Sequence, residues 1–497
     1  MQSFHKVLII TALALPSLLW GGSTKRGVCW DESAVKINAH HVELLSPGVC
    51  WVYNWGPDAG NSAVFSEDFS FQPMAWNGAY NESRIRSWLD AHPETRWLLA
   101  FNEPNFADQA RMTPEDAARA WPALEAIAAE YGLRLVAPAL NFSNSQVGGR
   151  VWNPYEWYDE FFRLLPNAKV DCLAMHCYMN WYSANTWLAT EYFYSDLYNS
   201  SKECYGRYPN LVRFLDSYKE RNGSFPKMML TEFCSWENDG SITGVDFQID
   251  QMTQKVQMLE RSDLIEGYAW FMANPSSGAS AYPYMSLLQT NSASSDLSEL
   301  GKVYTYMSEF DTERHYAPGE TIAAKDYVNA TTDNRQIKVR SNSDAASDIP
   351  LQTEYPQGAY ADYLIDVPQA GLYRISCRIS AAAAGQLALY IDNKRNSVLT
   401  IPATSGAWTD VEVEAQLPAG KHTLTPYNTG SASVLLNSLS FAATAGVESV
   451  TIDGAAEAVV EIVTLQGVSL GNPDAASLAP GLYLVRRADG SSSKFIK

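Results

Sequence analysis

Short apolar runs of the kind that form buried strands alternate with helix-like segments between residues 26 and 310. Parallel strands that are covered by helices on their outer face appear in a sequence as such continuous apolar runs. Eight strands with intervening helices over this length predict a (β/α)8 TIM barrel. The predicted strands cover residues 27–30, 48–55, 69–76, 96–101, 134–140, 170–178, 227–233 and 267–272.

The clearest predicted helix covers residues 113–131. It begins with Thr113-Pro114-Glu115-Asp116, which combines a capping hydroxyl, a proline at the first helical position and early acidic residues. A doubly wound open sheet is the alternative fold. It is disfavoured because no Gly-x-Gly-x-x-Gly follows the first predicted strand. Further helices are predicted at residues 82–91, 154–165, 211–221 and 246–261.

Two glutamates directly follow predicted strands. Glu103 follows the fourth strand and Glu232 ends the seventh. The carboxyl ends of barrel strands share one face, which is the catalytic face. Glycoside hydrolysis needs two carboxyl groups there, one as proton donor and one as nucleophile or base. A single such glutamate more often caps a helix or pairs with an arginine, but a pair flanked by Asn102 and Pro104 is more specific.

The overall charge narrows the choice of partners. The formal net charge of -19 argues against nucleic acid and against an anionic membrane surface. It agrees with a neutral or basic substrate, and equally with a charge that serves solubility alone. The 15 Trp and 27 Tyr suit stacking on sugar rings, although aromatic side chains also fill cores.

Residues 1–24 have the pattern of a signal peptide. His5 and Lys6 precede an apolar run from Val7 to Leu15 that is too short to span a bilayer. We therefore expect a secreted or cell-surface protein. Seven cysteines allow disulfides and leave at least one thiol free, and Cys29 and Cys50 could be neighbours on successive strands. No Cys/His spacing resembles a zinc site, so neither a metal nor a cofactor is expected.

The sequence pattern changes after Pro318. Helical periodicity gives way to short alternating strands separated by turns, which predicts an all-β sandwich at residues 319–442. A small β segment is expected at 446–497. The barrel domain is expected at 25–316.

Several strand-end motifs resemble family 128 of the clan A glycoside hydrolases. They are Phe101-Asn102-Glu103-Pro104-Asn105, Met175-His176-Cys177-Tyr178, Leu230-Thr231-Glu232-Phe233 and Tyr268-Ala269-Trp270-Phe271. The resemblance implies a retaining endo-β-1,3-glucanase that acts on laminarin-type glucan. It implies that Glu103 is the acid/base, that Glu232 is the nucleophile, and that Asn102 bonds the 2-hydroxyl of the sugar.

Other strand ends supply candidate substrate-binding residues. His176 and Tyr178 follow the sixth strand, where a tyrosine could donate a hydrogen bond to the nucleophile. A packed aromatic residue and a core histidine are the alternatives. The remaining candidates have core packing as their alternative, and they are Trp55, Trp76, Asn77 and Trp270. The aromatic segment 178–205 is predicted to form a wall of the substrate groove. The alternative for part of this segment is that it covers its own helix.

The predicted sandwich resembles carbohydrate-binding modules of family 6 or 35. The resemblance rests on Gly371-Leu372-Tyr373-Arg374, on residues 419–424 and on residues 436–441. It implies that Trp408 and Asn437, with Tyr360, bind sugar. The alternative is a noncatalytic sandwich that only packs on the barrel. The opening Ile322–Tyr327 departs from the acidic pattern of those modules, so we expect no calcium site. The tail resembles C-terminal sorting domains of secreted Bacteroidetes proteins, and an inert β cap is the alternative.

Two other functions compete with the β-1,3-glucanase. One is a clan A glycosidase that acts on another β-glycan. The other is a noncatalytic surface glycan-binding protein, which retention of both glutamates disfavours. In every case the expected partner is a glycan, and we expect a monomer.

Overall fold

The computed structural model describes residues 23–141, 145–178, 209–235, 244–275, 284–332 and 335–444, with parts of the tail at 459–464, 468–471, 478, 482–487 and 492–496. The chain divides into two compact units. The first comprises Met1–Thr312 and Ala324–Ala361, and the second comprises Glu313–Ala323 and Asp362–Lys497. The predicted signal peptide up to residue 22 and the aromatic segment after Tyr178 lie outside the described residues.

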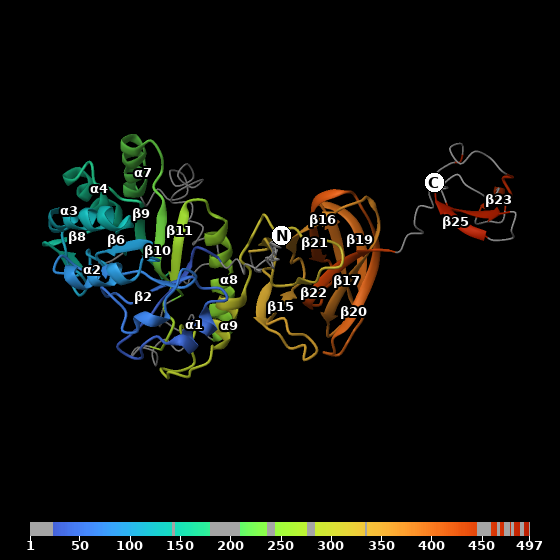
Figure 1. The fold of residues 1–497 in the computed structure, drawn as a ribbon, viewed down its shortest axis with the longest axis horizontal. Coiled ribbons are helices and arrows are strands. Elements are labelled where there is room, and N and C mark those ends of the chain that lie inside the picture. Colours follow the sequence, from blue (N-terminus) through green and yellow to red (C-terminus); the bar gives the residue numbers. More distant parts are fainter. Residues whose placement is uncertain are drawn as a thin grey trace, which may run out of the picture. The chain divides into compact units, whose positions relative to one another are not determined.

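A nine-stranded sheet with only parallel pairings forms the centre of the first unit (Figure 1). Its order is β3-β2-β1-β11-β10-β9-β6-β5-β4. The strands are β1 (Arg26–Cys29), β2 (Trp51–Tyr53), β3 (Ser70–Phe71), β4 (Met74–Ala75), β5 (Trp97–Ala100), β6 (Arg134–Leu140), β9 (Cys172–Cys177), β10 (Met228–Phe233) and β11 (Ile265–Trp270).

The two ends of this sheet belong to one short segment, because only Gln72 and Pro73 separate β3 from β4. The Gln72 N–H donates to Val52 O at 2.9 Å, and Pro73 O accepts from the Leu99 N–H at 3.0 Å. Pro73 has no N–H to give to a sheet, which divides the predicted third strand into two pieces. The sheet thus curves round to meet itself, and the predicted α/β class with a barrel-like core is confirmed.

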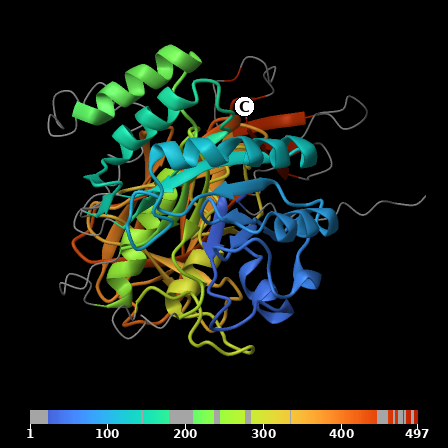
Figure 2. The same ribbon diagram turned by 90° about the vertical axis from the view of Figure 1, so that its left-hand side faces the viewer.

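The helices follow the predicted alternation, and Figure 2 shows the long helix α3, coloured cyan, across the outside of the strands. Helix α3 begins as its sequence predicts, because Thr113 accepts from the Asp116 N–H and Pro114 takes the first position. The helices in the described residues of this unit are α1 (Ala39–Leu45), α2 (Glu82–Ala91), α3 (Pro114–Tyr131), α4 (Pro154–Leu164), α7 (Pro209–Asn222), α8 (Val245–Arg261) and α9 (Glu299–Tyr306), with a 3-10 turn at Ser62–Val64.

Side chains fill the inside of the sheet. They form one buried cluster to which most of the strands contribute, including Cys29, Tyr53, Leu99, Val136, Ala174, Met229 and Ala269. A filled interior leaves no channel, so a binding site on such a core must lie at the strand ends.

Residues 324–361 group with the first unit, unlike in the predicted division at 316–319. They include β13 (Asn329–Ala330) and the antiparallel pair β14 (Lys338–Ser341) and β15 (Leu351–Tyr355). Arg340 explains the grouping, since it forms ion pairs at 3.0 and 2.8 Å with Asp246 and Asp250 of α8. A small hairpin, β7 (Gln146–Val147) and β8 (Arg150–Val151), completes the first unit.

The second unit contains antiparallel sheets, as the alternating pattern predicts. One sheet joins β12 (Ile322–Ala323), β22 (Val434–Ala443), β17 (Gly371–Ser380) and β20 (Thr409–Leu417). Another joins β16 (Ala361–Val367), β21 (Gly420–Asn428), β18 (Gly385–Ile391) and β19 (Lys394–Ile401). The tail has a three-stranded sheet of β23 (Val459–Thr464), β24 (Leu482–Arg487) and β25 (Ser492–Ile496).

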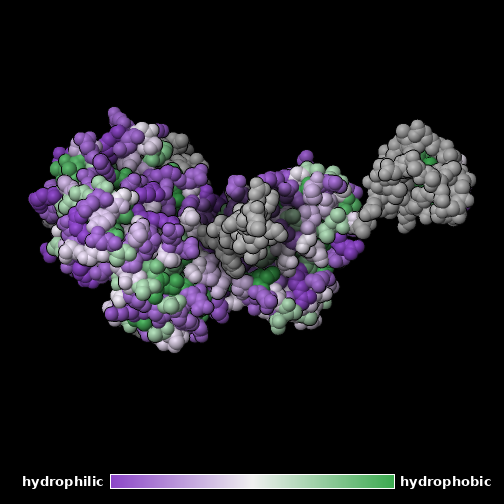
Figure 3. Space-filling model, viewed as in Figure 1, coloured by the Kyte–Doolittle hydropathy of each residue, from purple (hydrophilic) through white to green (hydrophobic). Residues whose placement is uncertain are grey.

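Hydrophilic residues dominate the face of both units in Figure 3. Within the described residues, no helix has the length and apolar character needed to cross a membrane. The six cysteines in this part of the chain are free thiols, including Cys29 and Cys50, and Cys204 lies outside it.

Candidate active site

The two glutamates face one cavity of about 540 Å³ at the carboxyl ends of the strands. Glu103 follows β5, and Glu232 lies near the end of β10. The pairing of β10 with β9 places Glu232 opposite His176. The cavity is lined by Asp31, Trp55, Trp76, Asn102, Glu103, Phe106, Gln109, Asn141, Tyr178, Glu232, Phe271 and Met272.

Backbone geometry turns two of these side chains into the cavity. Glu103 has a φ of 45° and Trp55 a φ of 59°, both in the left-handed region that side chains other than glycine seldom adopt. The Glu103 N–H still donates to Ala139 O at 2.8 Å, which holds the turn against β6. Such strained residues gather at functional sites, where the surrounding structure supports them.

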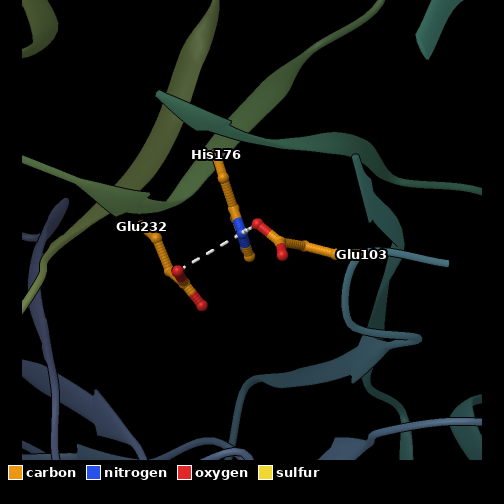
Figure 4. A group of neighbouring side chains, drawn as sticks. All are labelled: Glu103, His176 and Glu232. Atoms are coloured by element: carbon orange, nitrogen blue, oxygen red, sulfur yellow. Dashed lines mark hydrogen bonds and ion pairs between the residues drawn. The ribbon is translucent and has the colours of Figure 1, made fainter. Parts of the chain in front are cut away.

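His176 lies between the two carboxyl groups (Figure 4). Its Nδ1 is 2.7 Å from Glu103 Oε1 and 3.3 Å from Glu232 Oε2. The nearest ligand atoms of all three residues lie within 4.8 Å of one another. The imidazole is fully buried and both glutamates are nearly so, which makes them a single group of interacting charges.

Glu232 accepts hydrogen bonds from three neutral donors. Tyr178 donates to its Oε2, while the Trp55 indole and the Tyr53 hydroxyl donate to its Oε1 at 2.7 and 3.2 Å. Glu103 has one neutral donor, Asn141 Nδ2, at 3.0 Å. Donors of this kind favour an ionised carboxylate and fix its direction. Glu232 is therefore the more firmly held of the two.

Burial and the charge of His176 have opposite effects on the pKa values of Glu103 and Glu232: burial raises them and His176 lowers them. Burial raises the pKa of Glu232, and the nearby charge of Glu103 raises it further. Burial also acts to raise the pKa of Glu103, but the hydrogen bond and charge of His176, with Asn141, bring it below its ordinary value. Burial acts to lower the pKa of His176, yet the two carboxylates raise it. The shifts of Glu103 and His176 both favour a proton on His176 beside an ionised Glu103.

These three residues also supply the ligand types that a metal ion could use. However, the imidazole atom that faces both carboxylates, Nδ1, already takes part in the Glu103 hydrogen bond. Its Nε2 has no partner in the described part of the chain. Metal-binding histidines usually donate from their second nitrogen to a supporting group. The arrangement suits a shared proton better than a metal ion.

Asn102 presents an unpaired acceptor beside Glu103. Its Nδ2 donates to Gln109 Oε1 at 3.1 Å, while its buried Oδ1 finds no partner among the described residues. A buried acceptor without a donor costs free energy until something fills the gap. A sugar hydroxyl would do so. Aromatic side chains that can stack on sugar rings line the rest of the cavity, and they are Trp55, Trp76, Phe106 and Phe271.

Two candidates lie away from this cavity. Trp270 is fully buried, donates to Met285 O at 2.8 Å and packs edge-on against Phe233, so it is a core residue and not a sugar platform. The next residue, Phe271, lines the cavity instead. Asn77 lines a separate hollow, and its Oδ1 accepts from the Ala79 N–H at 2.9 Å, which makes it a turn residue.

The three accessory candidates divide between the two units. Tyr360, half-buried, belongs to the first unit, where its backbone pairs with Thr331. Trp408 in the second unit is half-buried just before β20. Asn437 in β22 is 1% exposed, so its side chain cannot reach a sugar on the surface. That part of the sugar-binding prediction is wrong for this residue.

Sequence reasoning missed three residues that contact the two glutamates or Asn102. Tyr53 donates to Glu232, Asn141 donates to Glu103, and Gln109 holds Asn102. A signal existed for two of them. Asn141 follows the fifth strand as Asn102 follows the fourth, and Tyr53 ends the second strand two residues before Trp55. Gln109 lies in a loop, and no sequence pattern pointed to it.

A family model described as the glycosyl hydrolase catalytic core matches residues 27–304. No curated protein matches the chain. Similar solved structures include a GH128 subgroup II endo-β-1,3-glucanase from Pseudomonas viridiflava, with 32% identity over 57% of this chain and 98% of that one and a TM-score of 0.41. Another from Sorangium cellulosum has 27% identity over 56% and 97%, with a TM-score of 0.42. A curdlan-specific exo-β-1,3-glucanase from Blastomyces gilchristii, of subgroup III, has 22% identity over 57% and 99%, with a TM-score of 0.39.

Proposed function

The chain belongs to the glycosyl hydrolase catalytic core family and is a glycoside hydrolase, and we propose that it is a retaining endo-β-1,3-glucanase. The observation that carries the proposal is the pair Glu103 and Glu232, which face one cavity with His176 between them. The β-1,3-glucan assignment is supported by the strand-end motifs. It is also supported by the 32% sequence identity to a Pseudomonas viridiflava enzyme named as an endo-β-1,3-glucanase.

The separation of the carboxyl groups supports the retaining mechanism. Retaining enzymes hold their two carboxyl groups about 5–5.5 Å apart, whereas inverting enzymes leave about 6.5–9.5 Å for a water molecule. The nearest oxygens of Glu103 and Glu232 lie within 4.8 Å of each other. A close approach of the two carboxyl groups agrees better with the retaining arrangement, in which Glu232 attacks the sugar itself.

In the first step, a Glu232 oxygen forms a bond to the anomeric carbon as the glycosidic bond breaks. The departing oxygen takes the proton of Glu103. In the second step Glu103 takes a proton from water, whose oxygen then displaces Glu232 and releases the product. Glu232 suits the nucleophile because its three neutral donors hold the carboxylate in one direction.

Glu103 must be protonated before it can act as the acid, although the hydrogen bond and charge of His176, with Asn141, lower its pKa. The hydrogen bond to His176 offers a source. A proton that moves over the 2.7 Å from Nδ1 to Glu103 Oε1 converts a charged imidazole and a carboxylate into a neutral imidazole and a carboxylic acid. Water excluded by the sugar would favour this neutral arrangement, because a low dielectric penalises separated charges.

The test is hydrolysis by the full chain of a panel of β-glucans, with the anomeric form of the first product followed by proton NMR. We expect release of oligosaccharides of mixed length from laminarin, initially as the β-anomer. An α-anomer would contradict the retaining mechanism. Cleavage of another β-glycan in preference to laminarin would contradict the proposal that β-1,3-glucan is the substrate. Binding of laminari-oligosaccharides without new reducing ends would show a glycan-binding protein.

We further propose that the second unit is a β-sandwich that assists substrate binding, and that residues 1–24 direct export. Alternating burial along β16, with Tyr363, Ile365 and Val367 buried, agrees with sheets that cover a core on one face only. Trp408 is the better candidate for sugar contact, since Asn437 is buried. Loss of curdlan binding in full-length Trp408→Ala would support the assignment, and unchanged binding would remove it.

A further inference from the structure

The Tyr53 hydroxyl lies next to the proposed nucleophile, Glu232. It has one proton to donate, and two acceptor oxygens are within hydrogen-bonding distance of it. Its hydroxyl oxygen is 3.2 Å from Glu232 Oε1 and 3.0 Å from Thr231 O. The side chain is fully buried in the barrel interior, so no water competes for this proton. A hydroxyl hydrogen turns about the C–O bond without movement of heavier atoms. Tyr53 can therefore exchange one acceptor for the other within a fixed frame.

An irregularity of strand β10 makes the second acceptor available. The pairing of β10 with β9 shifts register between Leu230 and Glu232, and its pairing with β11 shifts between Leu230 and Phe233. Thr231 falls in both interruptions. Such bulges redirect backbone groups beside active sites. Here the Thr231 carbonyl accepts from Tyr53 and from Cys29 Sγ, at 3.0 and 3.3 Å.

Cys29 is the third residue of this hydrogen-bonded arrangement, beside Tyr53 and Thr231. Its Sγ is 3.6 Å from the Tyr53 hydroxyl and 3.3 Å from Thr231 O, so the thiol also has two acceptors for one proton. When Tyr53 donates to Glu232, Cys29 can donate to Thr231. When Tyr53 turns to Thr231, Cys29 can donate to the Tyr53 oxygen. Each proton has an acceptor in both arrangements.

We propose that Tyr53 is a positioning residue that donates to Glu232 while this carboxylate is ionised and turns to the Thr231 carbonyl once Glu232 is bound to the sugar. The inference rests on the proposed function of Glu232 as nucleophile. The ester formed in the first step carries no charge and is a weaker acceptor than the carboxylate. No bond other than hydrogen bonds changes in this turn, and the proton stays on Tyr53 throughout.

The consequence concerns the pH at which Glu232 becomes ionised. The titratable groups that face Glu232 and Tyr53 are Cys29 of β1, Glu103 after β5, His176 and Tyr178 of the β9 end, and Cys234 after β10. Removal of the Tyr53 donor leaves all of these in place. The ionised form of Glu232 alone loses a hydrogen bond, so its pKa must rise.

The test compares Tyr53→Phe with Tyr304→Phe in the full chain. Tyr304 is equally buried, and its hydroxyl donates to Gly27 O at 2.7 Å, away from both glutamates. Both changes remove one buried hydroxyl. The first readout is the pH profile of kcat/KM on laminarin. We expect its acidic limb to move up by roughly one pH unit in Tyr53→Phe, as loss of a charged hydrogen bond implies. We expect no movement in Tyr304→Phe.

The second readout needs no substrate. The Trp55 indole N–H donates to the same Glu232 oxygen at 2.7 Å, so its NMR signal in protein labelled at tryptophan nitrogen reports the ionisation of Glu232. We expect the same upward movement in Tyr53→Phe alone. Equal midpoints in the two variants would overturn the proposal. If the wild-type chain left laminarin intact, the proposed function would fail, while the indole titration would still decide the part played by Tyr53.

Cys29→Ala gives a second test should Tyr53→Phe not fold. Without Cys29, the Thr231 carbonyl loses a donor and competes more strongly for the Tyr53 proton. We expect the indole midpoint to rise by less than in Tyr53→Phe but measurably. A midpoint equal to that of the wild-type chain would contradict the shared-proton arrangement.

Discussion

The barrel buries a group of charged and tyrosine side chains at each end, and Glu103 and Glu232 of the group at the carboxyl end line a cavity. At the amino end, Arg26 donates to Tyr268, to Ser308 O and to Tyr304 O at 3.1, 2.7 and 2.9 Å. It also pairs with Glu260 at 3.4 Å. At the carboxyl end, the group of Glu103, His176 and Glu232 is also buried. Its members pair with one another.

The difference lies in what each group leaves unpaired. Among the described residues, the buried side chains of the Arg26 group all have partners. At the carboxyl end, His176 Nε2 and Asn102 Oδ1 have none. Buried charge alone therefore does not identify an active site in this fold. Buried polar atoms without partners, beside a cavity, do so because they await groups that a substrate supplies.

The largest expected effect separates the two ends by activity. Glu232→Gln should lower laminarin turnover by at least about 10³-fold, because the amide cannot act as nucleophile. The fold should persist, since glutamine has the same shape. Its oxygen can accept from the Trp55 indole, and its NH2 group can donate to the Tyr178 hydroxyl oxygen. Initial rates and thermal unfolding measure the two quantities. Glu130→Gln, on the exposed side of α3, is the control and should change neither. Turnover at the wild-type rate would remove the proposed mechanism.

The amino-end group should respond in stability instead. Arg26→Met leaves Glu260 buried without its cation, and removal of one partner of a buried pair costs about 3–5 kcal/mol. We expect the free energy of unfolding to fall by this amount in urea titrations at pH 7. The folded fraction should keep the wild-type kcat on laminarin. A selective loss of kcat without loss of stability would mean that the two ends are functionally coupled.

The group at the carboxyl end should also make the stability of the fold depend on pH. The carboxylates raise the pKa of His176 although burial opposes them, so the folded state binds its proton more tightly than the unfolded state does. This contribution is complete below the unfolded pKa of about 6.5 and is lost as pH rises through the higher folded value. Unfolding free energies measured across this window should fall in the wild-type chain and fall less in His176→Gln.

His41 offers a control of opposite sign. Burial lowers its pKa, so its contribution is present above the unfolded pKa of about 6.5 and is lost as pH falls through the lower folded value. His41→Gln should therefore reduce the loss of stability below about pH 6.5 and leave the decline above that pH unchanged, whereas His176→Gln should weaken the decline above it. The same change in slope in both variants would contradict the directions of these two pKa shifts.

The smallest expected effects test where the substrate-binding cavity ends. Trp76 lines the cavity and Asn77 lines a separate hollow. Trp76→Ala should raise the KM for laminarin by roughly tenfold, equal to about 1.4 kcal/mol of lost binding. Asn77→Ala should stay within about twofold, as surface changes usually do. A larger effect of Asn77→Ala would extend the substrate groove into the second hollow.

Some of the site could be read from strand order alone. Several site residues follow or end apolar runs, namely Asn102, Glu103, His176, Tyr178 and Glu232. The carboxyl ends of parallel strands meet at one face, so these residues were expected to lie together. Trp270 shows where this reasoning fails. Successive residues of a strand point to opposite sides, so a shift of one position exchanges a core tryptophan for the cavity-lining Phe271.

The amino-acid pattern alone was enough to predict the α/β alternation, the cap of helix α3 at Thr113 and the placement of two glutamates at strand ends. Those features depend on local periodicity and on the parallel direction of the strands. The folded chain was needed to reveal that Tyr53 and Trp55 join Tyr178 at Glu232, and that His176 lies between Glu232 and Glu103. These contacts come from different strands, and their lengths depend on register shifts and on left-handed backbone turns that no local pattern specifies.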